Sequence, residues 1–238
     1  MTPAATEAAT DMKTYRLGKP LVVAIDGPSG SGKSSVSRET ARRLHAAYLD
    51  TGAMYRAVTW YCLKTGVALQ EAAEVEKATR EVDLRISTHP DHEQVTVSGT
   101  DVTQAIREPE ISGAVSAVAT TLGARAELIR RQQQIIADSG RRIVAEGRDI
   151  TTVVAPDAEV RILLTASEEA RLRRRGLQLG GTQSEQDLHN QVIARDAKDS
   201  TVVNFSEAAD GVFTVDSSDL DFEETIDAVL DVVRHAAH

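Results

Sequence analysis

The sequence has very little of several residue types, and each shortage excludes a class of protein. Its single cysteine is Cys62, so an internal disulfide is impossible and no cysteine cluster can bind zinc. No apolar run approaches the roughly 20 residues that span a bilayer, and residues 1–20 lack the apolar core of a signal peptide. We therefore expect a cytoplasmic protein that does not associate with membranes.

Aromatic residues are scarce as well, and the 27 basic residues are outnumbered by 36 acidic ones. Aromatics make up 3% of the chain, so the core must consist mainly of valine, isoleucine, leucine and alanine. The six histidines are scattered without a pair at metal-binding spacing. The formal net charge is −9, whereas proteins that grip a long phosphate backbone usually carry a basic surplus. Nucleic acid is therefore not an expected partner, and small phosphorylated ligands held by local arginine clusters fit better.

Short continuous apolar runs indicate a parallel sheet that is covered on both faces. We expect its strands at 21–25, 48–50, 143–145, 160–164 and 212–215. Helical patterns fall at 33–45, 53–63, 114–138 and 222–234, with Gly123 as a break in the third. Residues 83–99 instead alternate between apolar and polar positions, which predicts an antiparallel hairpin with one solvated face.

Residues 27–34 match the phosphate-loop pattern G-x-x-x-x-G-K-[ST] at every fixed position, between an expected strand and an expected helix. Glycines in such a loop let successive N–H groups point at phosphate oxygens beside a helix N-terminus. We expect Lys33 to act on the β- and γ-phosphates of ATP and the Ser34 hydroxyl to coordinate Mg²⁺. A flexible glycine and serine turn is the alternative. The ATP-binding candidates are Gly27, Pro28, Ser29, Gly30, Ser31, Gly32, Lys33, Ser34 and Ser35.

The phosphate loop indicates a nucleoside triphosphate without naming the reaction. A GTPase switch would need a guanine-reading N-K-x-D segment, which the chain lacks, and a transport or motor ATPase would ordinarily be larger. A small-molecule kinase is therefore favoured. The expected fold class is α/β, with a parallel-sheet P-loop kinase core flanked by helices, an inserted small antiparallel acceptor-binding lobe and a helical lid.

Two further segments lie where ligands bind in parallel sheets, at the carboxyl ends of strands. Arg56 follows the strand at 48–50 and could hold an acceptor phosphate in fork geometry, or be a solvated helix charge. Arg148 and Asp149 follow the strand at 143–145, where Asp149 could equally cap a helix. Glu146, at the end of the same strand, could hold water around Mg²⁺ or act as a cap.

A cluster of arginines follows the strand at 160–164. Arg171, Arg174 and Arg175 stand at i, i+3 and i+4 and share one helix face, whereas Arg173 pairs in sequence with Glu169 on another face. A transferring phosphoryl group spreads negative charge over its oxygens, which arginines on a mobile lid can neutralise. The glycine-rich stretch 176–184 favours such a lid over a solvated basic helix. The catalytic candidates are Lys33, Arg171, Arg174 and Arg175.

Together these segments resemble the bacterial cytidylate kinases, from about Pro20 to the C-terminus. The resemblance rests on the phosphate loop and on three segments: Leu49-Asp50-Thr51-Gly52-Ala53-Met54-Tyr55-Arg56, Glu146-Gly147-Arg148-Asp149-Ile150, and Arg195-Asp196 with Asp199-Ser200. It implies ATP-dependent phosphorylation of CMP and dCMP in pyrimidine nucleotide metabolism, with Mg²⁺ as cofactor. We expect a monomer whose partners are ATP, CMP and dCMP.

The resemblance also implies how CMP is bound. Arg56 and Arg148 would hold its phosphate, while Ser116, Arg125 and Asp149 would read the cytosine edge. Without the resemblance, Ser116 could be an ordinary helix-packing residue and Arg125 a solvated charge.

The remaining implied contacts concern the pocket wall and the ribose. Thr51 and Tyr55 would line the acceptor pocket, and Arg195 and Asp199 would reach the ribose, although Asp199-Ser200 alone could form a turn. Family members commonly carry an arginine shortly after this pair, where the present chain has Val202. The departure predicts thinner contact with the base or ribose and looser base selectivity.

We expect a leader at 1–19 and one kinase domain at 20–238. Within that domain the core would comprise about 20–80, 140–165 and 205–238. The acceptor-binding insert would span about 81–113 and the lid about 167–190.

Overall fold

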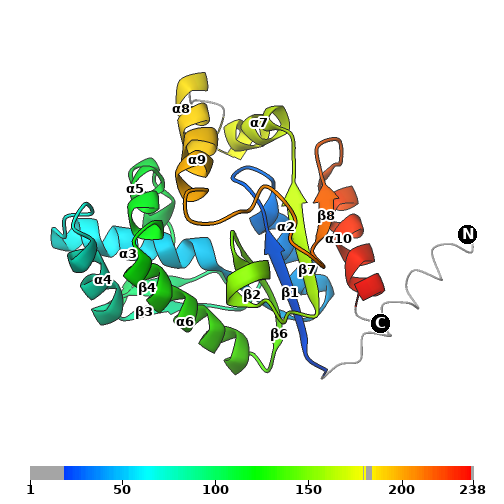
Figure 1. Ribbon diagram of the computed structural model, residues 1–238, viewed down its shortest axis with the longest axis horizontal. Helices are drawn as coiled ribbons and strands as arrows, with labels where there is room; N and C mark the ends of the chain where they lie inside the picture. Colours follow the sequence, from blue (N-terminus) through cyan, green and yellow to red (C-terminus); the bar gives the residue numbers. More distant parts are fainter. Residues whose placement is uncertain (1–18, 179, 181–183, 237–238) are drawn as a thin grey trace, which may run out of the picture.

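The computed structural model describes residues 19–178, 180 and 184–236, so that the expected leader lies almost wholly outside the described residues. A parallel sheet of five strands forms the centre, in the order β2-β6-β1-β7-β8. Its strands are β1 (Leu21–Asp26), β2 (Ala47–Asp50), β6 (Arg142–Gly147), β7 (Val160–Thr165) and β8 (Phe213–Asp216). The expected parallel α/β core is therefore confirmed (Figure 1).

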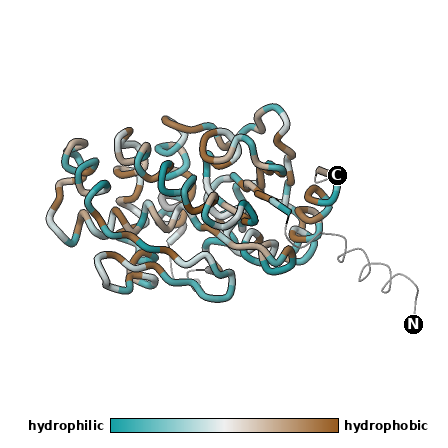
Figure 2. Tube along the Cα trace, turned by 90° about the horizontal axis from the view of Figure 1, so that it is seen from below, coloured by the Kyte–Doolittle hydropathy of each residue, from teal (hydrophilic) through white to brown (hydrophobic). Residues whose placement is uncertain are grey.

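Both faces of the sheet are buried, as the continuous apolar runs predicted. Val22 and Ala24 of β1 pack into a cluster with α3 (Thr51–Thr65), whereas Val23 and Ile25 point to the other face, toward α2 (Lys33–Arg43) and α10 (Phe222–Ala236). All four side chains are fully buried. Helix α10 is amphipathic, since Ile226, Val229 and Val233 are buried whereas Glu223, Asp227 and Asp231 are exposed. Figure 2 shows hydrophobic and hydrophilic residues interspersed along the helical coils.

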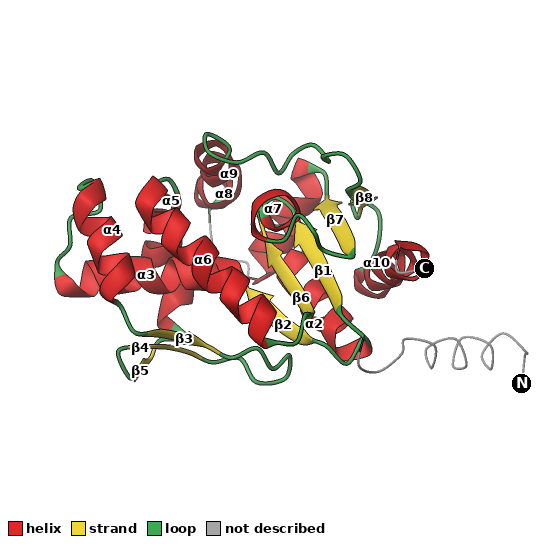
Figure 3. Ribbon diagram, turned by 60° about the horizontal axis from the view of Figure 1, so that its bottom comes forward, coloured by secondary structure: helices red, strands yellow, loops and turns green. Residues whose placement is uncertain are grey.

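A helical lobe extends from one edge of the sheet (Figure 3). It comprises α3, α4 (Ala72–Glu81), α5 (Pro109–Ala119), α6 (Leu122–Asp138), the short 3₁₀ turn η2 (Ala105–Arg107) and an antiparallel sheet of β3 (Leu84–Ile86), β4 (Val95–Val97) and β5 (Thr100–Asp101). The predicted hairpin is confirmed by the pairing of Leu84 with Val97, and β5 adds a third strand. The loop between β3 and β4 reaches the core, where Tyr48 N donates to Thr88 O over 2.8 Å.

The predicted break at Gly123 was wrong by a few residues. Helix α5 ends at Ala119 and α6 begins at Leu122, so Gly123 lies in the first turn of α6. Two threonine hydroxyls mark the actual break, because Thr120 Oγ1 donates to Ser116 O over 2.8 Å and Thr121 Oγ1 to Ala117 O over 2.9 Å. Gly123 instead permits close packing, since a Cβ there would lie 1.9 Å from the Glu76 carboxylate of α4.

Between β7 and β8 lie α7 (Glu168–Gln178), α8 (Glu185–His189), the π-helical turn η4 (Asn190–Ala194) and α9 (Arg195–Asp199), and Figure 1 shows α7, α8 and α9 at the end of the sheet where β1 and β7 terminate. Another π-helical turn, η3 (Ile150–Val154), follows β6 and donates hydrogen bonds from Ile150 N and Thr151 N to Asp26 of β1. The glycine-rich stretch 176–184 was expected to begin after the arginine helix, but α7 continues through Gln178, so the predicted first residue of the stretch was wrong. Residues 179 and 181–183 lie outside the described residues. Within the described ranges, no helix is both long and apolar enough to cross a membrane.

Candidate active site

The phosphate loop follows β1 directly and leads into α2, which begins at Lys33. Gly30 and Gly32 have φ angles of 78° and 87°, in the left-handed region that glycine adopts without strain. A Cβ at Gly30 would lie 2.7 Å from the backbone oxygen of Arg171, so the lid helix α7 packs on the loop at this glycine. The loop and α7 are therefore in direct contact in this structure.

Glu146 connects the loop to the neighbouring strand. Parallel pairing places it beside Ile25, one residue before β1 ends. Its carboxylate lies 2.7 Å from Lys33 Nζ, accepts a hydrogen bond from Ser34 Oγ over 2.6 Å, and is almost completely buried. Tyr48 OH also donates to it over 3.3 Å. Glu146 therefore caps no helix, and its carboxylate and the Ser34 hydroxyl form the oxygen-rich pair that suits Mg²⁺.

The N-terminus of α3 places Asp50, with Arg56 beside it, within electrostatic reach of Lys33. Asp50 caps the helix by accepting a hydrogen bond from Ala53 N over 2.8 Å, and its other oxygen lies 3.0 Å from Arg56 Nη2. Burial acts to raise the pKa of Asp50, but Arg56, the Ala53 N–H and Lys33 together lower it, so the carboxylate stays ionised. This side of the site thus contains a fixed anion that orients an arginine.

Thr51 and Tyr55, the predicted pocket-lining residues, are both buried. The Thr51 hydroxyl donates to Glu146 O over 2.8 Å, which links α3 to the end of β6. Burial, followed by the charge of Asp149, raises the pKa of Tyr55, against the charge of Arg125 and a side-chain interaction with Gln132 that lower it. Thr51 therefore links two elements of the frame, and Tyr55 lies within reach of the charges of Arg125 and Asp149.

Arg125 and Asp149 form a buried ion pair. Arg125 comes from α6 and Asp149 follows β6, so the fold joins residues that are distant in sequence. Burial raises the pKa of Asp149, an effect that Arg125 partly opposes. Arg125 also donates to Ala119 O over 3.1 Å. A carboxylate and a guanidinium side by side can accept from an amine and donate to a ring nitrogen or carbonyl.

Asp199 connects α9 to the acceptor side. It accepts a hydrogen bond from Ser116 Oγ of α5 over 2.8 Å and lies 3.2 Å from Arg148 Nε and 3.6 Å from Arg195 Nε. Burial, followed by the repulsion of Arg148, lowers the pKa of Arg195 to about 10. Arg148, Arg195 and the nearby Arg56 therefore bring positive charges close together, and a bound anion would stabilise them.

Three of the arginines carry buried donor atoms without a hydrogen-bond partner among the described residues. These atoms are Arg56 Nε, Arg148 Nη1 and Arg195 Nε. Unpaired buried donors cost free energy, so their presence together indicates a surface built to bind acceptor oxygens.

The lid arginines occupy the phosphate-loop side. Arg171 Nη1 donates to Ser29 O over 3.0 Å, and Arg174 Nη1 donates to Ser31 O over 3.1 Å. Arg174 also donates to Ser217 O over 2.6 Å, so it joins the lid to the segment after β8. Burial lowers the pKa of Arg175, and the nearby charge of Arg56 acts in the same direction. Arg173 is exposed, which agrees with the expected division of the helix faces.

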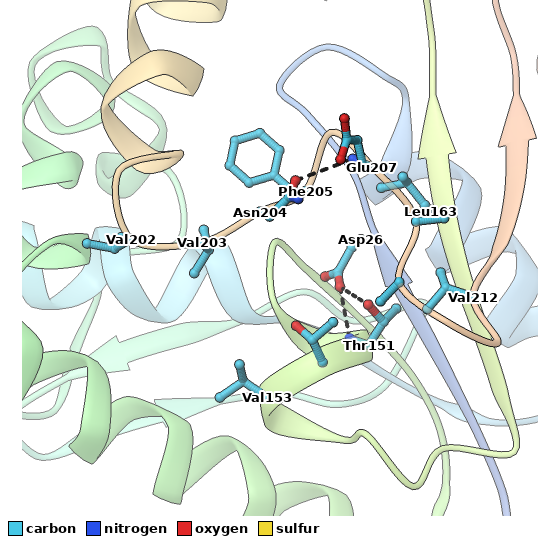
Figure 4. A pocket seen from close by; sticks show the side chains of 13 residues that line it. Asp26, Thr151, Val153, Leu163, Val202, Val203, Asn204, Phe205, Glu207 and Val212 are labelled. Atoms are coloured by element: carbon cyan, nitrogen blue, oxygen red, sulfur yellow. Dashed lines mark hydrogen bonds between the residues drawn. The ribbon is translucent and has the colours of Figure 1, made fainter.

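The segment after α9 contains the departure from the expected arginine. Val202 and Val203 help to line a pocket of about 340 Å³ together with Asp26 and Thr151 (Figure 4). Phe205 lies beyond them, and the Arg148 guanidinium carbon stands 4.4 Å from the centre of its ring. An aromatic face thus supports Arg148 from the chain segment in which the additional arginine was expected.

Sequence reasoning gave no role to three residues of this cluster, although Asp50 and Asp196 stand in segments that carry the resemblance. The role of Asp50 could have been found, because an aspartate directly before a helix is a frequent N-cap. The roles of Asp196 and Phe205 could not, since each contacts Arg148, a residue far away in sequence.

The phosphate loop follows the central strand of a parallel α/β core, arginines of α7 contact it, and Arg56, Arg148 and Arg195 gather beside it, which is the arrangement of a P-loop kinase. The cytidylate kinase family model matches residues 23–235. Cytidylate kinases of Cutibacterium acnes and Nocardia farcinica are each 48% identical over 90% of this chain. The alignments span 96% and 94% of the lengths of these two proteins. The Mycobacterium avium cytidylate kinase is 44% identical over 90% of this chain and 95% of its own length. The chain belongs to the cytidylate kinase family and is a kinase of nucleoside monophosphates.

Two solved structures, from Eubacterium ventriosum and Thermus thermophilus, align at 11% and 18% identity with TM-scores of 0.49 and 0.44. They cover 90% and 89% of this chain, and 98% and 97% of their own chains. The family assignment therefore depends on the sequence matches.

Proposed function

We propose that the chain transfers the terminal phosphoryl group of MgATP to the phosphate of CMP or dCMP by direct in-line displacement. One observation carries the choice of acceptor: the buried Arg125–Asp149 pair directly adjoins Arg148, whose unpaired donor lies in a group with those of Arg56 and Arg195, the charges of which act on one another. The pair offers an acceptor for the cytosine amine and donors for its ring nitrogen and carbonyl. The arginines supply the charge that the monophosphate needs.

The donor side would use the loop and the lid. Ser34 and Glu146 would hold Mg²⁺, the latter through water, and the ion would neutralise charge on the β- and γ-phosphates when bound. Lys33 lies beside Glu146 and Ser34 and would neutralise negative charge on the phosphoryl group during its transfer. Arg171, Arg174 and Arg175 would add positive charge in the transition state and exclude water from the reacting phosphate.

The acceptor side would fix CMP at a set distance from the loop. Arg56 and Arg148 would hold its phosphate and Arg195 and Asp199 its ribose, while Ser116 would orient Asp199 through their 2.8 Å hydrogen bond. Alignment of the acceptor oxygen with the γ-phosphate would supply much of the rate acceleration. We further propose that the division into core, insert (about 81–113) and lid (about 167–190) describes the parts that move during turnover.

An acceptor panel tests the proposal. ADP release would be measured with ATP alone and then with CMP, dCMP, UMP, AMP and shikimate. We expect release to depend on an acceptor and to be fastest with CMP or dCMP, with some turnover of UMP because Val202 replaces a possible base or ribose contact. Equal release with and without acceptors would contradict the kinase mechanism, and preference for AMP would contradict the acceptor alone.

A further inference from the structure

Asp196 of α9 lies against the phosphate loop. One of its carboxylate oxygens accepts a hydrogen bond from Ser29 N over 3.1 Å and lies 2.7 Å from Arg148 Nη2. The other oxygen accepts from Ser29 N over 3.3 Å and from Arg171 Nη1. The side chain is 13% exposed. A single carboxylate therefore contacts a loop N–H, one acceptor-side arginine and one lid arginine.

These three donors are of the kind that bind phosphate oxygens. Loop N–H groups and arginine forks both favour anions, and a carboxylate presents two oxygens with several lone pairs to them. We propose that Asp196 is an internal anion that competes with nucleotide phosphate for the loop and for Arg148 and Arg171. Phosphate binding displaces it and frees both arginines for the reaction. The inference rests on the proposed function only for the identity of the phosphate groups that Arg148 and Arg171 bind once Asp196 has left.

The remaining contacts allow Asp196 to leave without dismantling the site. Arg148 keeps its ion pair with Asp199 at 3.2 Å and its stacking on Phe205. Arg171 keeps its hydrogen bond to Ser29 O at 3.0 Å. Displacement of Asp196 by phosphate therefore exchanges one anion for another, while the other contacts of Arg148 and Arg171 persist. We call Asp196 in this role a latch, which is closed when it contacts the loop and open when phosphate has displaced it.

A latch of this kind weakens nucleotide binding by the fraction of molecules in which it is closed. If nine molecules in ten are closed, the apparent affinity falls about tenfold. Because Asp196 contacts both sides of the cleft, the first substrate to bind opens the latch for the second. The two substrates then bind with positive coupling of about the same size, and this coupling is reciprocal.

The test is a calorimetric titration of the full chain with the magnesium complex of the imido analogue of ATP. Asp196→Asn and Asp196→Ala both remove the competing charge, so each should bind the analogue about tenfold more tightly than the wild type. Glu169→Gln removes one negative charge from an exposed position on α7 and serves as the control, with unchanged affinity. Equal or weaker binding by the folded Asp196 variants, or an equal gain in the control, would overturn the latch.

A second titration measures the coupling. CMP is added to the wild type and to Asp196→Asn, each with and without the analogue, and the roughly tenfold coupling of the wild type should nearly vanish in the variant. A merely structural role for Asp196 would weaken binding and leave the coupling in place, which contradicts the proposal. Failure of CMP turnover in the acceptor panel would reject the proposed function, while the analogue titration would still report on the latch.

Discussion

At the scale of single residues, the role of Glu146 follows from where its strand ends. Parallel pairing with β1 brings its carboxylate to Lys33 and to Ser34 in a buried position. Burying a carboxylate costs free energy unless it has such partners, and here they are a lysine ammonium and a hydroxyl. Its chemistry therefore depends on the register of two strands.

Glu146→Gln tests this role, because the amide keeps the shape of the side chain and removes its charge. We expect a 10- to 100-fold loss of activity together with a higher Mg²⁺ concentration for half-maximal rate, as is usual for residues that orient a metal's ligands. Steady-state rates across a Mg²⁺ series would measure both effects. The exposed Glu74→Gln should behave as the wild type, and an unchanged Mg²⁺ dependence in Glu146→Gln would argue against the role.

Phe205→Leu tests the support that an aromatic face gives to Arg148. Loss of a partly buried cation–π contact is worth about 0.5–2 kcal/mol, so we expect the KM for the acceptor to rise about 2- to 30-fold. The KM for ATP should change little. Phe213→Leu is the matched control, since Phe213 is exposed on β8. Equal effects on both KM values would contradict a specific contact with Arg148.

At the scale of elements, α7 divides its arginines between two faces. Arg171 and Arg174 contact the phosphate loop, and Arg173 is exposed. The i, i+3, i+4 spacing predicted this division, because periodicity alone fixes which side chains share a helix face. It could not predict that Arg174 would also bind the segment after β8, since that contact depends on the docking of the helix.

Arg174→Ala and Arg173→Ala form a matched pair on this helix. We expect the first to lower kcat about 10²- to 10³-fold with a much smaller effect on CMP binding, because a group that neutralises developing charge acts mainly in the transition state. The second should be close to neutral. Single-turnover rates and equilibrium binding of CMP would separate the two effects, and similar large losses in both variants would contradict the assignment of faces.

Other elements show where local patterns stop being informative. The β1 and β6 runs were predicted because both faces of a central strand are apolar. The boundary between α5 and α6 was misplaced, because glycine is a common helix breaker and the hydroxyls of Thr120 and Thr121 gave no comparable signal. Glycine is a poorer helix former than threonine, so the break was expected at Gly123. In the structure Gly123 lies inside α6, where it lets this helix pack closely against Glu76 of α4.

At the scale of the whole molecule, Asp26 links the sheet to the acceptor side. It accepts hydrogen bonds from Ile150 N over 2.9 Å and from Thr151 N over 2.8 Å, and it lies at the base of the phosphate loop. Burial raises the pKa of Asp26 to about 6, against hydrogen bonds that lower it and with Asp149 adding repulsion. Its ionisation therefore costs stability in the folded protein.

The sign of the pH dependence follows from that raised pKa. Between the ordinary pKa of an aspartate and about 6, the folded state holds a proton that the unfolded state has lost, so this group's contribution to stability falls as pH rises. We expect the unfolding free energy of the wild type relative to Asp26→Asn to fall by about 2 kcal/mol from pH 4 to pH 7. Urea unfolding of both proteins across this range would measure it. A difference that is constant or rises with pH would contradict the buried titration.

The sequence by itself determined the chemistry that one contiguous segment can carry. The phosphate loop, the apolar strands and the shared face of the lid arginines all follow from local spacing, because turns, pleats and helices impose fixed periods on neighbouring residues. The charge balance favoured small phosphorylated ligands over nucleic acid, which stays an expectation.

Only the tertiary structure decided which distant residues share a site. Strand register placed Glu146 beside Lys33, helix packing placed Arg125 on Asp149, and α9 placed Asp196 on the phosphate loop. The physical reason is that a buried charge must find its partner wherever the fold provides one, and that distance in sequence does not limit the choice.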